Sequence, residues 1–222
     1  VWDSHYTRPR ALQAYPDENV VRVLKKEFAH AIPGSTALDL GSGSGRHLPI
    51  LAEHFSSTIA CDFSLNSLKL YSGTDLGAFQ AALPELPFAD ASFDFILCWG
   101  VLHYLPDSLI APAAMEIHRC LKPGGLVFLT LRSDSDTHLA GQLSKGDLAH
   151  GHAKLFSKAD ALAFFAGYTK TEYGFISRQP LGESSAATNS GQWGCVISHR
   201  RKERSAPTLA TRVASGRVTS RL

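Results

Sequence analysis

Three glycines at every second position, Gly41, Gly43 and Gly45, are the residues whose type and spacing point most directly to chemistry in this chain. They follow an apolar run that ends with Asp39 and Leu40, and they precede a second apolar run that is typical of a helix. Glycine lets the backbone turn tightly and lets a ligand approach the main chain without meeting a Cβ atom. The start of a helix adds N–H groups that have no partner within the helix. The pattern therefore predicts a nucleotide-cofactor site.

The spacing of these glycines separates two classes of nucleotide cofactor. A dinucleotide site has the pattern G-x-G-x-x-G, in which the last glycine lies on the helix. Counted from Gly41, that position is Arg46, whose long side chain would crowd the packing of the helix against the strand. The pattern argues against an NAD-dependent oxidoreductase, which stays open as an alternative at this point.

Three further segments follow the glycines in order. Residues 58–61 are typical of a short strand that leads into Asp62, 21 positions after Gly41. An acid about 20 residues past a glycine loop can accept hydrogen bonds from ribose hydroxyls. Residues 86–94 read Leu-Pro-Phe-Ala-Asp-Ala-Ser-Phe-Asp, and residues 116–125 read Glu-Ile-His-Arg-Cys-Leu-Lys-Pro-Gly-Gly. Each segment is common alone, but four in this order are specific.

Together these segments resemble the motifs of the class I S-adenosylmethionine-dependent methyltransferases, and most closely the small-molecule enzymes grouped as type 11. The glycines after an acidic residue resemble motif I of that family. Residues 86–94 resemble its LPF…D.SFD segment, and residues 116–125 resemble the E..R.LKPGG turn before its fifth strand. The resemblance is strong over residues 36–131, where these motifs lie, and weaker over residues 17–199.

The resemblance implies S-adenosylmethionine as the cofactor and gives roles to residues at strand ends. The glycine loop would cradle the methionine part, and Asp39 would orient that loop or reach the amino group through water. Asp62 would hold the ribose, with Phe63 against the adenine. The full set of cofactor-binding residues that we expect is Asp39, Gly41, Ser42, Gly43, Gly45, Asp62, Phe63, Ala82, Leu83 and Trp99.

One position departs from the family pattern. Relatives often carry an acid, four positions before the leucine of the LPF segment, that contacts the adenine amino group. This chain has Ala82 there. Recognition of the adenine would then depend on backbone groups around Ala82 and Leu83.

His103 is the best candidate for a catalytic side chain. Methyl transfer from a sulfonium depends mostly on alignment and on the exclusion of water, but an alcohol or phenol acceptor also needs a general base. His103 follows the predicted fourth strand, where the acceptor normally meets the methyl group, and the pKa of histidine suits the task. The alternative is a structural histidine that packs beneath the site or bonds the backbone.

The N-terminal segment is rich in aromatic residues. In relatives of this kind the region before the first strand folds over the cofactor as a lid, so Tyr6 and Tyr15 would touch the methionine end or the acceptor. The alternative is a surface strap that packs its aromatic side chains on the edge of the sheet.

Helices and strands are expected to alternate, which indicates right-handed crossovers and a mostly parallel sheet. A first helix would begin at Asp17 or Asn19, bury Val20, Val21, Leu24, Phe28 and Ala31 on one face, and end at Pro33-Gly34. The pattern between the last two strands is not helical, which favours an antiparallel pair. The predicted fold is α/β, a Rossmann-like doubly wound, mostly parallel seven-stranded sheet with an antiparallel edge pair. We expect strands at 36–40, 58–61, 79–82, 93–98, 126–131, 168–177 and 192–199, and further helices at 44–54, 64–72, 108–121 and 157–166.

Charge is uneven along the 222 residues. Residues 200–222 hold seven basic residues and one acid, whereas the rest of the chain holds 15 basic and 19 acidic residues. The predicted domains are a lid or helical segment at 1–33, an S-adenosylmethionine-binding methyltransferase domain at 34–202 and a disordered basic tail at 203–222. A basic tail can touch nucleic acid or an anionic membrane, but no aromatic residue lies among its charges, and we favour a solvated terminus.

Metal binding and disulfide bonds are not expected. The four cysteines, Cys61, Cys98, Cys120 and Cys195, are scattered, which favours buried reduced thiols. The pairs His150/His152 and Asp134/Asp136 have no evident partner ligands. No apolar run reaches the 18 residues of a transmembrane helix, and we expect a cytoplasmic protein.

The sequence thus predicts an S-adenosylmethionine-dependent methyltransferase that acts on an oxygen or nitrogen of a small molecule. Two other possibilities share the scaffold: a methyltransferase that acts on protein or RNA, and a non-catalytic S-adenosylmethionine-binding protein. We expect a small-molecule acceptor, no membrane partner and no nucleic-acid partner. The oligomeric state cannot be read from the residues.

Overall fold

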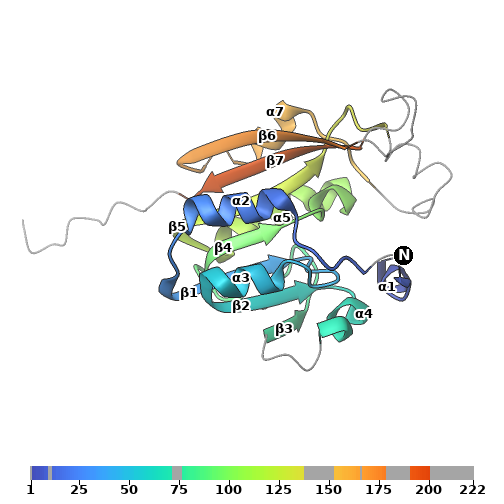
Figure 1. Ribbon diagram of the computed structural model, residues 1–222. Helices are drawn as coiled ribbons and strands as arrows, with labels where there is room; N and C mark the ends of the chain where they lie inside the picture. The colour runs from blue at the N-terminus through green and yellow to red at the C-terminus, as the bar shows by residue number, and fades with distance from the viewer. Residues whose placement is uncertain are drawn as a thin grey trace, which may run out of the picture.

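The computed structural model describes residues 2–9, 12–71, 77–137, 153–165, 167–178 and 191–200 of the chain. Its strands form one seven-stranded sheet in the order β3-β2-β1-β4-β5-β7-β6 (Figure 1). The five strands from β3 to β5 are parallel, and β7 is antiparallel to both β5 and β6. The predicted fold class is therefore confirmed, including the antiparallel pair at one edge. The strands are β1 (Ile32–Leu40), β2 (Phe55–Asp62), β3 (Gly77–Gln80), β4 (Phe93–Cys98), β5 (Leu121–Arg132), β6 (Lys170–Arg178) and β7 (Gly191–His199).

Helices cover both faces of the sheet, because successive strand residues point to opposite sides. Ala37, Phe95 and Phe128 pack in the cluster that includes the buried face of α2. Leu38 and Ile96, each one position away, pack in the other cluster with α5. Figure 1 shows α2 and α3 together on one side of the sheet. The helices are α1 (Trp2–His5), α2 (Glu18–Glu27), α3 (Leu48–His54), α4 (Leu65–Leu68), α5 (Asp107–Cys120) and α7 (Lys158–Ala163), with short 3₁₀ turns η2 (Lys69–Tyr71) and η3 (Leu102–Tyr104).

The helix predicted near Asp17 is α2, which begins as predicted but ends earlier, and the short α1 before it was not predicted. The Asp17 side chain accepts a hydrogen bond from the Asn19 amide at 3.0 Å and caps the N-terminus of α2. The helix stops at Glu27, where Phe28 leaves the helical conformation. Pro33 and Gly34 therefore do not end the helix; they lie in β1, so the boundary predicted after residue 33 falls inside that strand.

The buried face of α2 also differs from the prediction. Val23 is buried in place of Val21, and Ala31 is exposed beyond the end of the helix. Similarly, α3 begins at Leu48 rather than at residue 44, because residues 44–47 continue the turn of the glycine loop. The strands β2 and β5 extend several residues toward their N-terminal ends beyond the predicted limits.

Arg119 links the two segments 86–94 and 116–125 through its side chain. The Arg119 guanidinium donates to both carboxylate oxygens of Glu116 at 2.8 and 2.6 Å, and to Asp90 at 2.7 Å. Glu116 in turn accepts from the Leu86 amide at 3.0 Å, and Arg119 also donates to the Leu86 carbonyl at 3.4 Å. We call these four residues the Arg119 clamp. The clamp holds the segment before β4 against the end of α5.

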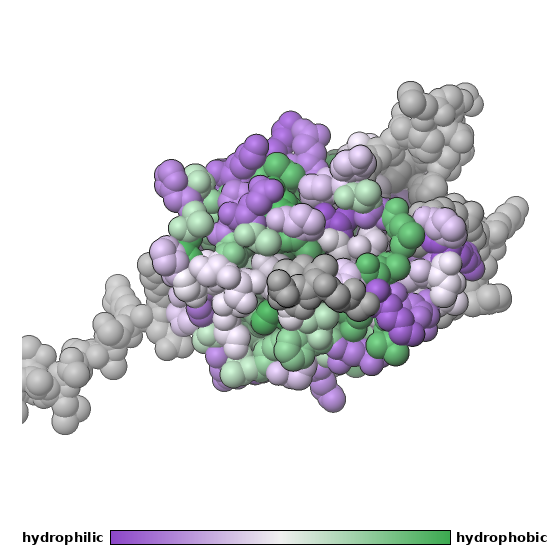
Figure 2. All heavy atoms as spheres, turned by 60° about the horizontal axis from the view of Figure 1, so that its bottom comes forward, coloured by the Kyte–Doolittle hydropathy of each residue, from purple (hydrophilic) through white to green (hydrophobic). Residues whose placement is uncertain are grey.

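The β3 edge of the sheet is open. All four residues of β3 are exposed, and the exposed large hydrophobic side chains near this edge include Phe63, Leu65, Leu70 and Phe79. Figure 2 brings this lower end of the molecule forward and shows hydrophobic side chains scattered among hydrophilic ones. In the described part of the chain no helix has the length and apolar composition needed to cross a bilayer.

All four cysteines are buried, and none of them forms a disulfide bond. Cys61 lies in β2 and Cys98 in β4, inside the predicted strands. Burial raises the pKa of the Cys61 thiol to about 12. These thiols are core residues and have no reactive environment.

Candidate functional site

The glycine loop follows β1 directly and is folded back on the end of β2. The amides of Gly41 and Ser42 both donate to the Cys61 carbonyl, at 2.7 and 3.2 Å. Gly41 has a φ of +73°, and a Cβ atom there would lie 2.2 Å from Cγ2 of Val101. A Cβ atom on Gly43, with a φ of +53°, would lie 2.6 Å from the Tyr6 hydroxyl. Both positions need glycine, because the backbone conformation and the close neighbours exclude a side chain.

Asp62 lies at the end of β2 with its carboxylate fixed by two backbone amides. Its Oδ2 accepts from the Gly43 amide and its Oδ1 accepts from the Ser64 amide, each at 2.9 Å. Burial raises the pKa of this carboxyl, and the hydrogen bonds from Ser64 and Gly43 act in the opposite direction. A carboxylate offers about four acceptor positions, and these two amides use only two of them. Because Asp62 also lines the cavity, its carboxylate can accept hydrogen bonds from a diol bound there.

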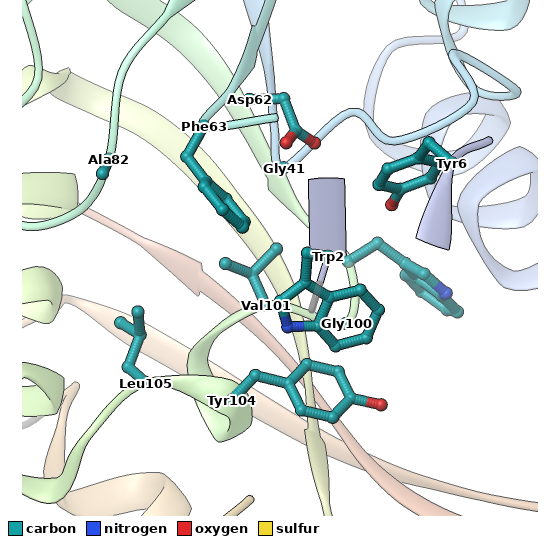
Figure 3. A pocket seen from close by; sticks show the side chains of 11 residues that line it. Trp2, Tyr6, Gly41, Asp62, Phe63, Ala82, Gly100, Val101, Tyr104 and Leu105 are labelled. Carbon is teal, nitrogen blue, oxygen red and sulfur yellow. The ribbon is translucent and has the colours of Figure 1, made fainter. Parts of the chain in front are cut away.

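A cavity of about 310 Å³ opens above Asp62 at the carboxyl ends of the parallel strands. Figure 3 shows the Asp62 carboxylate and the Phe63 ring facing this space, with Val101, Trp2 and Tyr104 on the other side. We call this cavity the main lobe. It is lined by Trp2, Tyr6, Gly41, Asp62, Phe63, Ala82, Trp99, Gly100, Val101, Tyr104 and Leu105.

A second cavity of about 200 Å³ shares six of these lining residues and lies along the glycine loop. We call it the loop lobe. Its additional lining residues are His5, Gln13, Ser42, Gly43, Ser44, Arg46 and His47. The two lobes together place a carboxylate, a glycine loop and aromatic faces around one elongated space. In open α/β sheets, this edge of the sheet is where ligands bind.

The model of the methyltransferase domain family matches residues 38–129, which run from β1 into β5 and include the glycine loop and Asp62. This match supports the resemblance to the class I S-adenosylmethionine-dependent methyltransferases.

Two curated relatives of this methyltransferase domain each match over less than half of the chain. Malonyl-[acyl-carrier protein] O-methyltransferase of Herminiimonas arsenicoxydans is 36% identical over 108 residues, which are 47% of this chain and 40% of that protein. Demethylmenaquinone methyltransferase of Corynebacterium urealyticum is 38% identical over 93 residues, which are 42% of this chain and 40% of that protein. The chain thus spans about 40% of the length of these two relatives.

A solved structure shares the fold over a larger part of the chain. The putative methyltransferase of Bacillus halodurans C-125 superimposes with a TM-score of 0.65 and 16% sequence identity. The match covers 83% of this chain and all of that one. At this identity the likeness concerns the fold.

Seven of the predicted site residues line the two lobes of the methyltransferase domain. Gly41, Asp62, Phe63, Ala82 and Trp99 line the main lobe, and Ser42 and Gly43 line the loop lobe. Gly45 and Leu83 do not: a Cβ atom on Gly45 would meet Tyr71 and Leu48, and Leu83 is a buried core residue.

Asp39 lies beneath the glycine loop and outside the cavity lining. It is 1% exposed, and its Oδ2 has no hydrogen-bond partner. Burial raises the pKa of its carboxyl to about 7, the nearby Asp62 adds to the increase, and Arg46 opposes it. At neutral pH the domain therefore holds a carboxyl group close to its point of ionisation directly under the loop.

This raised pKa predicts a stability change that depends on pH. Because the folded-state pKa lies above the unfolded one, the contribution of Asp39 to stability is complete below about pH 4 and is lost as the pH rises through 7. Asp39→Asn stays neutral, so it should raise the melting temperature of the ligand-free protein clearly more at pH 8 than at pH 5. Each unit by which the folded-state pKa differs from the unfolded-state pKa corresponds to about 1.4 kcal/mol in the free energy of unfolding.

Thermal unfolding at the two pH values measures this effect. The control is Asp90→Asn, whose side chain is 79% exposed and which should show no such difference between the two pH values. Equal shifts for Asp39→Asn at pH 5 and pH 8 would contradict the prediction.

His103 does not face the cavity. It is 1% exposed within η3, and burial lowers the pKa of its imidazole to about 3. Its Nδ1 has no hydrogen-bond partner, and its ring packs on Tyr104 with centroids 4.2 Å apart. The structure therefore speaks against a general base at His103 and favours the structural alternative.

The N-terminal segment lies over the cavity and is attached at two places. Asp3 accepts hydrogen bonds from the Ser64 hydroxyl at 2.8 Å and from the Asn66 amide at 3.1 Å, at the start of α4. Gln13 exchanges hydrogen bonds with the Ser44 hydroxyl, which accepts at 3.3 Å and donates at 2.9 Å. These contacts place residues 2–6 against the glycine loop.

The two tyrosines singled out in this segment have different positions. Tyr6 lines both lobes, whereas Tyr15 is 83% exposed and lines neither. Trp2 and Tyr104, which line both lobes, were not expected there from the sequence. The aromatic composition of residues 2–6 was the available signal for Trp2.

Of the two residue pairs considered as metal ligands, Asp134/Asp136 and His150/His152, the first forms no metal site within the described residues. Asp136 is fully buried and pairs with Arg132 at 2.6 Å, and no group of three potential metal ligands occurs among the residues that the structure covers. His150, His152 and the basic tail lie outside the described residues, so the expectations about them stay predictions.

Proposed function

We propose that this protein transfers a methyl group from S-adenosylmethionine to an oxygen or nitrogen of a small molecule. One observation carries the proposal: the Asp62 carboxylate, held by the Gly43 and Ser64 amides, faces a cavity that the glycine loop also lines. The activities of two curated relatives, O-methylation of malonyl-[acyl-carrier protein] and methylation of demethylmenaquinone, support methyl transfer to a metabolite.

The residues of the two lobes fit this cofactor in shape and charge. Asp62 would accept hydrogen bonds from the two ribose hydroxyls, and Phe63 would cover the adenine. Ala82 offers no carboxylate to the adenine amino group, so the backbone near Ala82 would take that role. The glycine loop would hold the methionine part, where close approach to the main chain is possible.

When bound, S-adenosylmethionine supplies a methyl group already activated on a cationic sulfur. The faces of Tyr6, Trp99 and Tyr104 line both lobes and would attract that positive charge. The attached N-terminal segment would exclude water from the reacting atoms. Because His103 is buried, we assign the chain the tasks of binding, alignment and exclusion of water, and we assign it no general base.

Binding of S-adenosylhomocysteine tests the proposal. Isothermal titration of the intact protein should show one site with a dissociation constant in the micromolar range, about −8 kcal/mol. NADH should give no heat. A folded protein that binds NADH and not S-adenosylhomocysteine would overturn the assignment.

Transfer itself is measured with S-adenosylmethionine labelled at the methyl group and a pool of small metabolites. Label should appear in an extractable small molecule. Tight cofactor binding without transfer to any member of the pool would favour a non-catalytic binding protein. Transfer of label to added RNA or protein alone would favour the other alternative.

A further inference from the structure

The two lobes of the cavity differ in charge. Arg46 lines the loop lobe, together with His5 and His47. In the main lobe, Asp62 is the one acidic or basic side chain among the described lining residues. A carboxylate on the cofactor is therefore best placed in the loop lobe, beside Arg46 and the loop amides. With the adenosine part placed at Asp62 and Phe63, the part of the main lobe near Val101 and Leu105 is left for a second molecule.

That remaining end is walled by apolar and aromatic side chains. The rings of Trp2 and Tyr104 pack with their centroids 4.5 Å apart and their planes at 60°. Val101 and Leu105 complete the wall, and Figure 3 shows all four side chains gathered on one side of the space. A charged group placed here would lose water without gaining an ionic partner, which is costly. A flat uncharged ring would gain contact with the indole and the phenol.

Tyr104 adds one polar group to this wall. Tyr104 lines the main lobe, and a phenol can donate a hydrogen bond to an oxygen atom of a bound ring. Burial, the larger effect, raises the pKa of this phenol, and Arg132 lowers it. Arg132 is itself held by Asp136 at 2.6 Å.

We infer that the part of the main lobe near Val101 and Leu105, beside the paired rings of Trp2 and Tyr104, takes the methyl acceptor, and that this acceptor is an uncharged flat ring bearing an oxygen that accepts a hydrogen bond from Tyr104. The inference rests on the proposed function and names the substrate class for the same site. It makes Trp2 a specificity-determining residue and Tyr104 an acceptor-binding residue. It excludes small phosphorylated or carboxylated acceptors from this end of the cavity.

The test uses three probes with the full chain at saturating S-adenosylhomocysteine: 2-naphthol, naphthalene and phosphoethanolamine. Quenching of tryptophan fluorescence and ligand-observed NMR report binding. We expect saturable binding of 2-naphthol and naphthalene and none of phosphoethanolamine. Binding of phosphoethanolamine as tight as that of 2-naphthol would overturn the inference.

Variants locate the site. Trp2→Ala should weaken the binding of both ring probes, whereas Trp2→Phe should retain it. Binding to these variants is measured by NMR, because they lack one tryptophan fluorophore. Tyr104→Phe should lower the affinity for 2-naphthol about fivefold and leave the affinity for naphthalene unchanged, because only the hydrogen bond is lost. Met115→Ala, on the exposed side of α5, is the matched control and should change neither.

The outcomes separate this inference from the proposed function. If S-adenosylhomocysteine does not bind, the proposed function fails first. If it binds while 2-naphthol does not, or while Trp2→Ala leaves both ring probes unaffected, the acceptor class alone is wrong.

Discussion

Asp62→Ala is expected to weaken the binding of S-adenosylhomocysteine by about 100-fold, the loss of about 2.7 kcal/mol. The carboxylate would accept hydrogen bonds from two ribose hydroxyls, and hydrogen bonds to charged groups contribute about 1.5–3 kcal/mol each. The substitution also removes the acceptor of the Gly43 and Ser64 amides, which fix the loop relative to β2. Isothermal titration of the two proteins at the same pH measures the ratio.

Two further variants make this experiment specific. Asp62→Asn keeps the size and one oxygen acceptor but loses the charge, so its affinity should lie between those of the wild type and Asp62→Ala. Asp90→Ala removes a carboxylate of the Arg119 clamp, away from the cavity, and should leave the affinity unchanged. An Asp62→Ala protein that is folded and binds with wild-type affinity would falsify the ribose-binding role of this residue.

Gly41→Ala should disrupt both the loop and the cavity wall. The new Cβ atom would lie 2.2 Å from Cγ2 of Val101, and the residue would keep a φ of +73° that favours glycine. Because Val101 lines the main lobe, its displacement changes the shape of the cavity. We expect a loss of stability of about 1–3 kcal/mol and a loss of affinity for S-adenosylhomocysteine of more than about tenfold.

The chain contains a matched control for this substitution. Gly34 has nearly the same φ, +74°, and a Cβ atom there would meet nothing within 4 Å. Gly34→Ala should therefore cost only the backbone strain, about 1 kcal/mol, and leave the affinity unchanged. The double variant Gly41→Ala, Val101→Ala should recover part of the stability, because it removes the clash. Urea unfolding and titration of all four proteins measure these differences, and equal behaviour of the two single glycine variants would count against the argument.

The parts of the fold that the sequence predicts are those marked by local patterns. Phe93–Cys98 is predicted and observed with the same limits, because a short apolar run between Ser92 and the Trp99-Gly100 turn is a local signal. The order of strands and helices is confirmed for the same reason. The start of α3 was wrong by four residues, because the loop conformation at Gly45 depends on packing against Tyr71 from a later segment.

The candidate site also has a part that the sequence predicts and a part that it does not. The loop and Asp62 follow strand ends, so topology alone brings them to one edge of the sheet. The contact of Trp2 with Tyr104 joins residues about 100 positions apart, and no local pattern reports it. The burial of His103 could not be predicted either, because a single 3₁₀ turn is too short for a periodic pattern to indicate which side chain faces the core.

The Arg119 clamp changes what the shared motifs mean. Asp90 and Leu86 belong to the LPF segment, and Glu116 and Arg119 belong to the segment that precedes β5, so the two motifs are halves of one hydrogen-bonded unit. None of these four residues lines either lobe. The two motifs therefore report that the chain has this scaffold. They do not report which methyl acceptor, if any, the scaffold serves.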